Sequence, residues 1–128
     1  MTIESIKLAS RVKYWRNVLA IEKIWEIDVN VVKLAKDMPP GNIDSAGCCL
    51  TDSSYFQATI HFCEENISSL AELECTVIHE LLHIVLHPLE LAARSSMTPS
   101  HEEVSDMLIE STIERLSRAF VTAYKARP

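Results

Sequence analysis

Three features that would indicate a membrane or nucleic-acid-binding protein are missing from this chain of 128 residues. Its lysines and arginines form no block, and the formal net charge is −6, so the basic surface of a nucleic-acid-binding protein is absent. There is no run of about 18 uncharged apolar residues, and no apolar segment near the N-terminus that resembles a secretion signal. We therefore expect a single soluble, cytoplasmic domain spanning 1–128, with neither a nucleic-acid nor a membrane partner.

The sequence also lacks C-x-x-C pairs, which are typical of cysteine-based zinc cages. Four cysteines are present, at Cys48, Cys49, Cys63 and Cys75, and the first two are adjacent. Because no pairing pattern is visible, we interpret them as free, mostly buried thiols in a reducing compartment rather than as disulfides or metal ligands.

Only two glycines occur, and both lie in the segment 38–47, which also contains two prolines and is the strongest loop signal of the chain. Before it, apolar residues at helical spacing predict a helix over 5–23, and alternating β-branched residues predict a strand over 24–32. After it, a turn at 51–54 separates two further strands, the second of which covers Phe56 to Phe62. The first half of the chain thus predicts one helix and about three strands.

Two helices are predicted in the second half. Ser69 and Glu72 fit a capping box, and Pro88 should end that helix at about His87. A second capping box at 100–103 predicts another helix that continues to about Tyr124. The expected fold class is α+β: an N-terminal helix, a small, mostly antiparallel sheet of about three strands, and two C-terminal helices.

The segment HELLH, residues 79–83, matches the pattern H-E-x-x-H. On a helix, His79 and His83 stand one turn apart on one face, so two imidazoles can converge on one zinc ion, and Glu80 lies beside them as a candidate general base. His87 continues the four-residue step. It would lie about 12 Å from His79 along the axis, which is too far to share a metal whose ligand bonds are about 2 Å.

A third ligand must come from another element, and the last predicted helix offers four glutamates: Glu102, Glu103, Glu110 and Glu114. The apolar stripe of this helix includes Ile109 and Ile113, and Glu102 falls within about 20° of Ile109 at ~100° per residue. Glu103 falls about 120° away, on the side of Glu110 and Glu114. We therefore predict Glu102 as the third zinc ligand. Asp106, on the same stripe, is predicted to orient a histidine through its outer ring nitrogen.

His79-Glu80-x-x-His83, followed by Glu102-x-x-Ser105-Asp106, resembles the gluzincin arrangement of thermolysin-type zinc peptidases. In that family, a following helix supplies a glutamate and, one turn later, an aspartate. The short chain and its layout are similar to the compact minigluzincins and to small phage- and mobile-element-type metallopeptidases. The resemblance is specific over 69–110 and implies a zincin-like fold.

The motif and the resemblance together indicate a zinc-dependent metallopeptidase acting on a peptide or protein substrate. Zn²⁺ would be held by His79, His83 and Glu102, with Glu80 as the general base. The strand from Gln57 to Phe62 would hold an extended peptide if it borders the cleft. One alternative is a zinc-binding regulatory or interaction domain without turnover. It is favoured because no residue matches the oxyanion-assisting histidine or tyrosine of the family. Another alternative is a zinc hydrolase with a non-peptide substrate.

Overall fold

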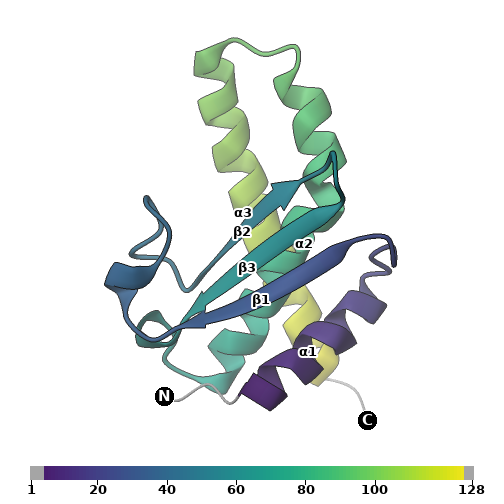
Figure 1. The fold of residues 1–128 in the computed structure, drawn as a ribbon. Helices are drawn as coiled ribbons and strands as arrows, with labels where there is room; N and C mark the ends of the chain where they lie inside the picture. The colour runs from purple at the N-terminus through teal and green to yellow at the C-terminus, as the bar shows by residue number, and fades with distance from the viewer. Residues whose placement is uncertain (1–4, 126–128) are drawn as a thin grey trace.

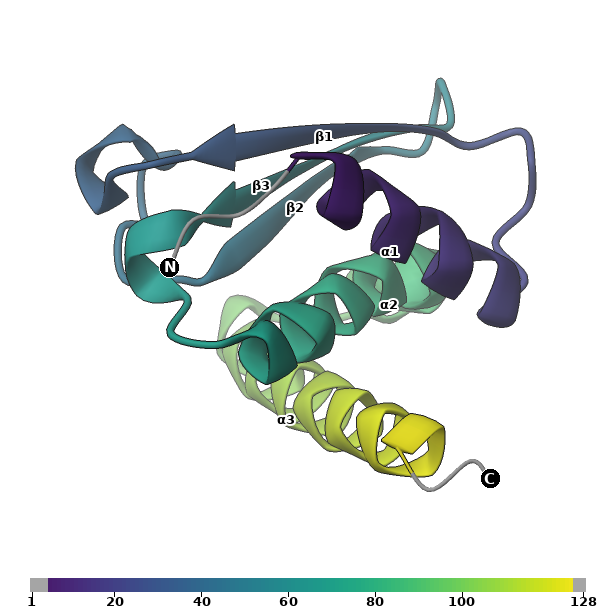
Figure 2. The same cartoon turned by 90° about the horizontal axis from the view of Figure 1, so that it is seen from below.

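The computed structural model describes residues 5–125 and has the expected α+β fold (Figure 1). Figure 2 shows three layers: the sheet, then α1 with α2, then α3. The elements in chain order are α1 (Ser5–Val18), β1 (Glu26–Val32), η1 (Ala35–Asp37), β2 (Gly47–Asp52), β3 (Gln57–Cys63), η2 (Glu64–Asn66), α2 (Leu70–Arg94) and α3 (Pro99–Lys125).

The three strands form one mixed sheet in the order β1-β3-β2. β1 pairs with β3 in parallel and β2 pairs with β3 antiparallel, so only one of the two pairings has the antiparallel direction that the sequence favours. Ala58, Ile60 and Phe62 of the central strand are buried, as expected for alternate residues of a strand whose one face covers the core. β2 is an edge strand of this sheet, which matters for the site described below.

Helix α1 ends at Val18, five residues before the predicted end at Lys23. Ala20 has a left-handed backbone with φ of 53°. The N–H of Ala20 donates to the carbonyl of Asn17, and the N–H of Ile21 donates to the carbonyl of Arg16. This is the Schellman pattern that terminates helices, here with alanine at the position where glycine is preferred.

The serine half of the capping box at the start of α2 forms as predicted, because the Ser69 side chain accepts a hydrogen bond from the N–H of Glu72. The carboxylate of Glu72 accepts from the N–H of Ser68 and not from that of Ser69. The predicted end at His87 is wrong: α2 continues through Pro88 to Arg94. Proline removes one backbone donor, but packing of the helix beyond it can outweigh that loss. Leu86, just before the proline, packs against the core, and beyond the proline Arg94 donates to Asp106 of α3 at 2.6 Å, which ties the extension to its neighbour.

Helix α2 is the central helix and packs against α1, β2 and α3. By length and composition alone it could cross a membrane, and 33% of its most apolar stretch is buried in the fold. The core helix of a soluble protein passes the same test, so this property does not identify a membrane span.

Helix α3 begins at Pro99, and the N–H of Glu102 donates to the carbonyl of Thr98. Thr98 therefore precedes the helix, and Ser100 of the predicted capping box lies inside the first turn. Proline in the first helical position is favourable, because its missing N–H would have no partner there.

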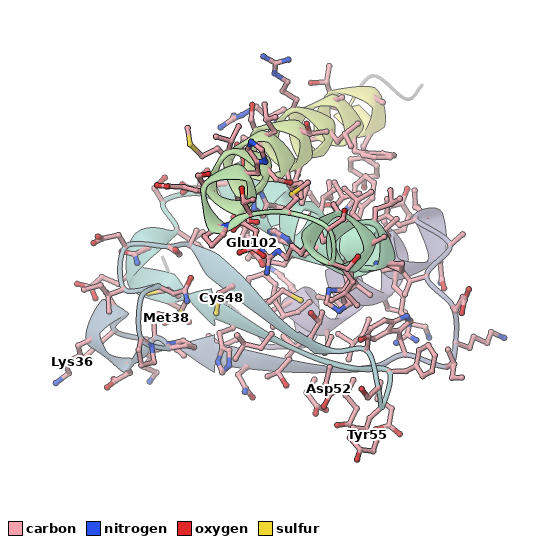
Figure 3. All side chains as sticks on the ribbon, turned by 90° about the horizontal axis from the view of Figure 1, so that it is seen from above. Lys36, Met38, Cys48, Asp52, Tyr55 and Glu102 are labelled. Atoms are coloured by element: carbon pink, nitrogen blue, oxygen red, sulfur yellow. The ribbon has the colours of Figure 1, made fainter. Side chains whose placement is uncertain are left out.

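All four cysteines are free, and Cys48 and Cys63 are buried, in agreement with the sequence. Met38 and Cys48, labelled in Figure 3, form a small second core with Cys63 beneath η1. At the opposite end of the sheet, Tyr55 projects outward from the turn between β2 and β3, far from the helices (Figure 3).

Candidate metal centre

His79 and His83 lie on the face of α2 that meets α3, one helical turn apart, as their spacing predicts. Their ring centroids are 5.2 Å apart, and their side chains are only 17% and 20% exposed. Two imidazoles in such surroundings need polar partners, because burying their nitrogens without hydrogen bonds is unfavourable.

The carboxylate of Glu110, on α3, supplies a partner to both rings. One of its oxygens lies 3.2 Å from Nε2 of His79, and the other lies 2.8 Å from Nε2 of His83. Ligand atoms of these three residues all lie within 4.8 Å of one another. A tetrahedral ion with bonds of about 2.1 Å would hold its ligand atoms about 3.4 Å apart, so small adjustments would suffice to admit a metal.

Glu102, the predicted third ligand, does not belong to this group. It lies in the first turn of α3, two turns before Glu110 and therefore about 12 Å away along the helix axis. Asp106 does not orient a histidine, since its carboxylate accepts a hydrogen bond from Arg94. The structure thus brings Glu110, not Glu102, to the histidine pair.

Glu114 lies one turn beyond Glu110 and contacts the outer nitrogen of His79, with 3.0 Å between its Oε2 and Nδ1. A carboxylate on the outer nitrogen of a ligating histidine fixes its tautomer and increases its basicity. A glutamate that faces both histidines and a second acid four residues later are therefore present, at Glu110 and Glu114.

Glu80 is buried beside the histidines, with 4% of its surface exposed. Burial raises the pKa of Glu80 to about 7, with a further increase from the charge of Glu110, although the charges of His79 and His83 act in the opposite direction. A carboxyl group whose pKa is close to neutral can both accept and return a proton at physiological pH.

The charges of the group perturb one another. Burial lowers the pKa of His79 and His83, but the hydrogen bonds to Glu110 and the charges of Glu80 and Glu110 outweigh it and raise both values. The same hydrogen bonds hold the pKa of Glu110 well below its usual range. Without a metal, protonated imidazoles and an ionised Glu110 stabilise each other, and protons therefore compete with a cation for this site.

A cleft of about 1000 Å³ opens in front of these residues, between β2 on one side and α2 with α3 on the other. Its lining includes His79, Glu80, His83 and Glu110, together with Gly47 to Leu50 of the edge strand. The predicted peptide-binding strand, β3, cannot accept another strand because both of its edges are already paired. β2 is the strand that borders the cleft.

Gly47 allows β2 to approach α2 closely over Glu80. A Cβ at this position would lie 2.9 Å from Cγ2 of Thr76, 3.2 Å from Cγ of Glu80 and 3.2 Å from the carbonyl oxygen of His61. Only glycine leaves these neighbours in place. The close packing also explains why Glu80 is so thoroughly buried.

His87 lies outside the metal group, as expected. Its Nδ1 is 3.2 Å from Oγ1 of Thr51, at the end of β2, and its ring packs edge-on to Trp25.

Comparisons of the chain with protein-family models, with curated proteins and with solved structures found no significant match.

Proposed function

We propose that the protein is a zinc-dependent metallopeptidase. The observation that supports this most directly is the position of Glu80, a buried carboxyl group with a near-neutral pKa beside the group of His79, His83 and Glu110. A purely structural metal site needs no proton acceptor beside its ligands, whereas hydrolysis requires one. The side chains also suit a zinc ion, which accepts two imidazoles and one carboxylate and leaves a position open in catalytic sites.

In this proposal, His79, His83 and Glu110 hold the ion. A zinc ion held there would supply Lewis-acid chemistry, with a pKa of roughly 7 for the attacking water and polarisation of the substrate carbonyl. Glu80 takes a proton from the attacking water and returns it to the leaving amine, so that one water and one peptide bond become a carboxylate and an amine. Glu114 keeps the ring of His79 in the tautomer that presents Nε2.

An extended peptide would bind along β2. This strand pairs with β3 on one side only, so its other edge offers backbone donors and acceptors toward the cleft. Adding a strand to such an edge secures the peptide backbone without reading its sequence. The substrate class is therefore an unstructured peptide or a flexible protein segment.

The test compares wild type with Glu80→Gln, and uses Glu103→Gln as a matched control on an exposed face of α3. Zinc per chain is measured by elemental analysis, and cleavage of an unstructured peptide library is measured with zinc supplied and with a chelator. We expect about one zinc in all three proteins and a fall in cleavage on the order of 10² or more in Glu80→Gln alone. Equal cleavage by wild type and Glu80→Gln would refute the proposed role of Glu80.

A zinc-binding domain without turnover is the second candidate. It is favoured by the cleft lining, in which the described residues include no tyrosine and no histidine besides His79 and His83 to assist an oxyanion. This candidate predicts that the zinc-loaded wild type cleaves no peptide of the library under any condition. In that case Glu80→Gln would change neither cleavage nor zinc content.

A further inference from the structure

Glu90, on the part of α2 beyond Pro88, is a partly buried acid with no evident structural role. Its side chain is 15% exposed, and its Oε1 is inaccessible and has no hydrogen-bond partner. It borders a groove between α2 and α3 whose walls are mainly apolar, including Leu86 and Ile109. A buried carboxylate oxygen without a partner is unfavourable, so an acid retained in this position calls for an explanation.

Two groups near Glu90 could act as its partner. One is Arg94, one turn further along α2, whose pKa is raised in part by the charge of Glu90. The guanidinium of Arg94, however, donates to Asp106 at 2.6 Å. The other is His83, whose Nδ1 lies 3.5 Å from Oε1 of Glu90. Nε2 of His83 already faces Glu110 at 2.8 Å, so Nδ1 is the nitrogen that remains for Glu90.

Helix geometry places these two residues on the same face, because Glu90 follows His83 by seven residues, or two turns. Their backbones are about 10.5 Å apart along the axis, so the two side chains extend toward one another to bring Nδ1 and Oε1 to 3.5 Å. The residue reaches this place only because α2 continues through Pro88.

We propose that Glu90 is a positioning residue for the metal centre: its Oε1, which lies 3.5 Å from Nδ1 of His83 without a hydrogen bond, would accept one from Nδ1–H when the metal is bound and thereby fix the tautomer whose Nε2 faces the metal. This inference rests on the proposed metal site. Glu114 has the corresponding contact with His79, so each histidine has a carboxylate behind it, one from α3 and one from α2 itself. Such outer partners typically contribute a factor of about 10 to 100 in metal affinity.

The test uses Glu90→Leu and Glu90→Gln, with Glu103→Gln as the control carboxylate that lies away from the site. Zinc affinity is measured by competition with a chelating dye. We expect Glu90→Leu to bind zinc about 10 to 100 times more weakly than wild type. Glu90→Gln should remain within a few-fold, because its amide oxygen can still accept the Nδ1–H bond, and Glu103→Gln should be unchanged.

Two further measurements separate positioning from a structural role. The thermal midpoint of the metal-free protein should stay the same or rise in Glu90→Leu, because a leucine fits the apolar groove better than an unpartnered acid. In zinc-loaded wild type and Glu90→Gln, nitrogen-15 NMR should show a slowly exchanging Nδ1 proton on His83, and this proton should exchange rapidly in Glu90→Leu.

The inference is overturned if Glu90→Leu binds zinc as tightly as wild type, or if Glu90→Gln loses as much affinity as Glu90→Leu. These failures differ from failure of the proposed function. A wild type that binds no zinc refutes the metal centre itself, whereas a zinc-binding wild type with an unaffected Glu90→Leu variant refutes only the role of Glu90.

Discussion

Replacing Gly47 with alanine should destabilise the protein chiefly through the shortest of three tight contacts, the one with Thr76. The added Cβ would lie 2.9 Å from Cγ2 of Thr76, whereas carbon atoms pack favourably at about 3.5 to 4.0 Å, so strand and helix must separate by at least ~0.6 Å. Overpacking of this kind costs about 1 to 3 kcal/mol. Alanine recovers about 0.5 to 1 kcal/mol because it restricts the unfolded chain more than glycine does.

The expected net loss is therefore about 1 kcal/mol, or about 4 °C in thermal midpoint for a chain of this size. Thr76→Ser removes the clashing methyl group and keeps the hydroxyl that donates to the carbonyl of Glu72 at 2.8 Å. The Gly47→Ala substitution should consequently cost less in a Thr76→Ser background, with a coupling energy of about 0.5 kcal/mol or more.

Urea unfolding of the four metal-free proteins in this cycle measures the coupling. Gly41→Ala is the matched control: Gly41 has φ of +85°, and an added methyl group would meet no atom within 4 Å, so alanine there is strained by its backbone alone. Thr76→Ser should not relieve that strain. A Gly47→Ala protein as stable as wild type would contradict the proposed contact. So would a Thr76→Ser background that reduces the stability loss of Gly47→Ala no more than it reduces the stability loss of Gly41→Ala.

Three further predictions follow from the same structure. Glu110→Ala should weaken zinc binding far more than Glu102→Ala in a chelator competition assay; equal affinities would show that Glu110 is not the ligand. The metal-free protein should lose stability as pH rises from about 5 to 8, because folding raises the pKa values of His79, His83 and Glu80. The contribution of a group with a raised pKa to stability is fully present below its pKa in the unfolded chain and is lost as the pH rises through its pKa in the folded protein. Urea midpoints at several pH values measure this slope, which should flatten in Glu80→Gln, and an increase of stability with pH would contradict it. Ala20→Gly should stabilise the protein by about 1 kcal/mol, since glycine adopts a left-handed backbone without strain, and an unchanged or lower thermal midpoint would refute this reasoning.

Local signals in the sequence were sufficient for most of the fold. Alternating β-branched residues located β1, and the only glycines and prolines of the first half located the loop before β2. Ser69 and Glu72 marked the start of α2, and the H-E-x-x-H spacing placed two histidines on one helix face. Each of these features depends on residues within a few positions of one another.

The third member of the metal group could not be found in this way, because it depends on where two helices end. In an antiparallel helix pair, residues at equal distances from the connecting loop lie at the same level. His83 precedes Ser95 by 12 residues, and Glu110 follows Thr98 by 12. The prediction of Glu102 rested instead on the apolar stripe of the last helix, an argument that set aside the side carrying Glu110 and Glu114. In the structure that side faces His79 and His83, and Glu102 lies about 12 Å from Glu110 along the helix axis.

The wrong prediction that α2 ends at His87 concealed the role of Glu90. A helix that ends at His87 places residue 90 in a loop, where no contact with His83 would be expected. Propensity rules treat proline as a helix breaker, yet the contacts of Leu86 and Arg94 with the rest of the fold keep the chain helical on both sides of Pro88. Only the tertiary structure reveals that competition.

The two walls of the cleft belong to different segments of the chain, so substitutions can alter one wall without the other. Every candidate metal-site residue, from His79 to Glu114, belongs to the α2–α3 hairpin, whereas the wall proposed to hold the peptide is the separate strand β2. Leu50 of that strand is 52% exposed and makes no part of the metal group. If the proposed function holds, substitutions at Leu50 would alter which peptides are accepted without changing the proposed catalytic residues, so selection or design could diversify specificity on one segment while the other is preserved.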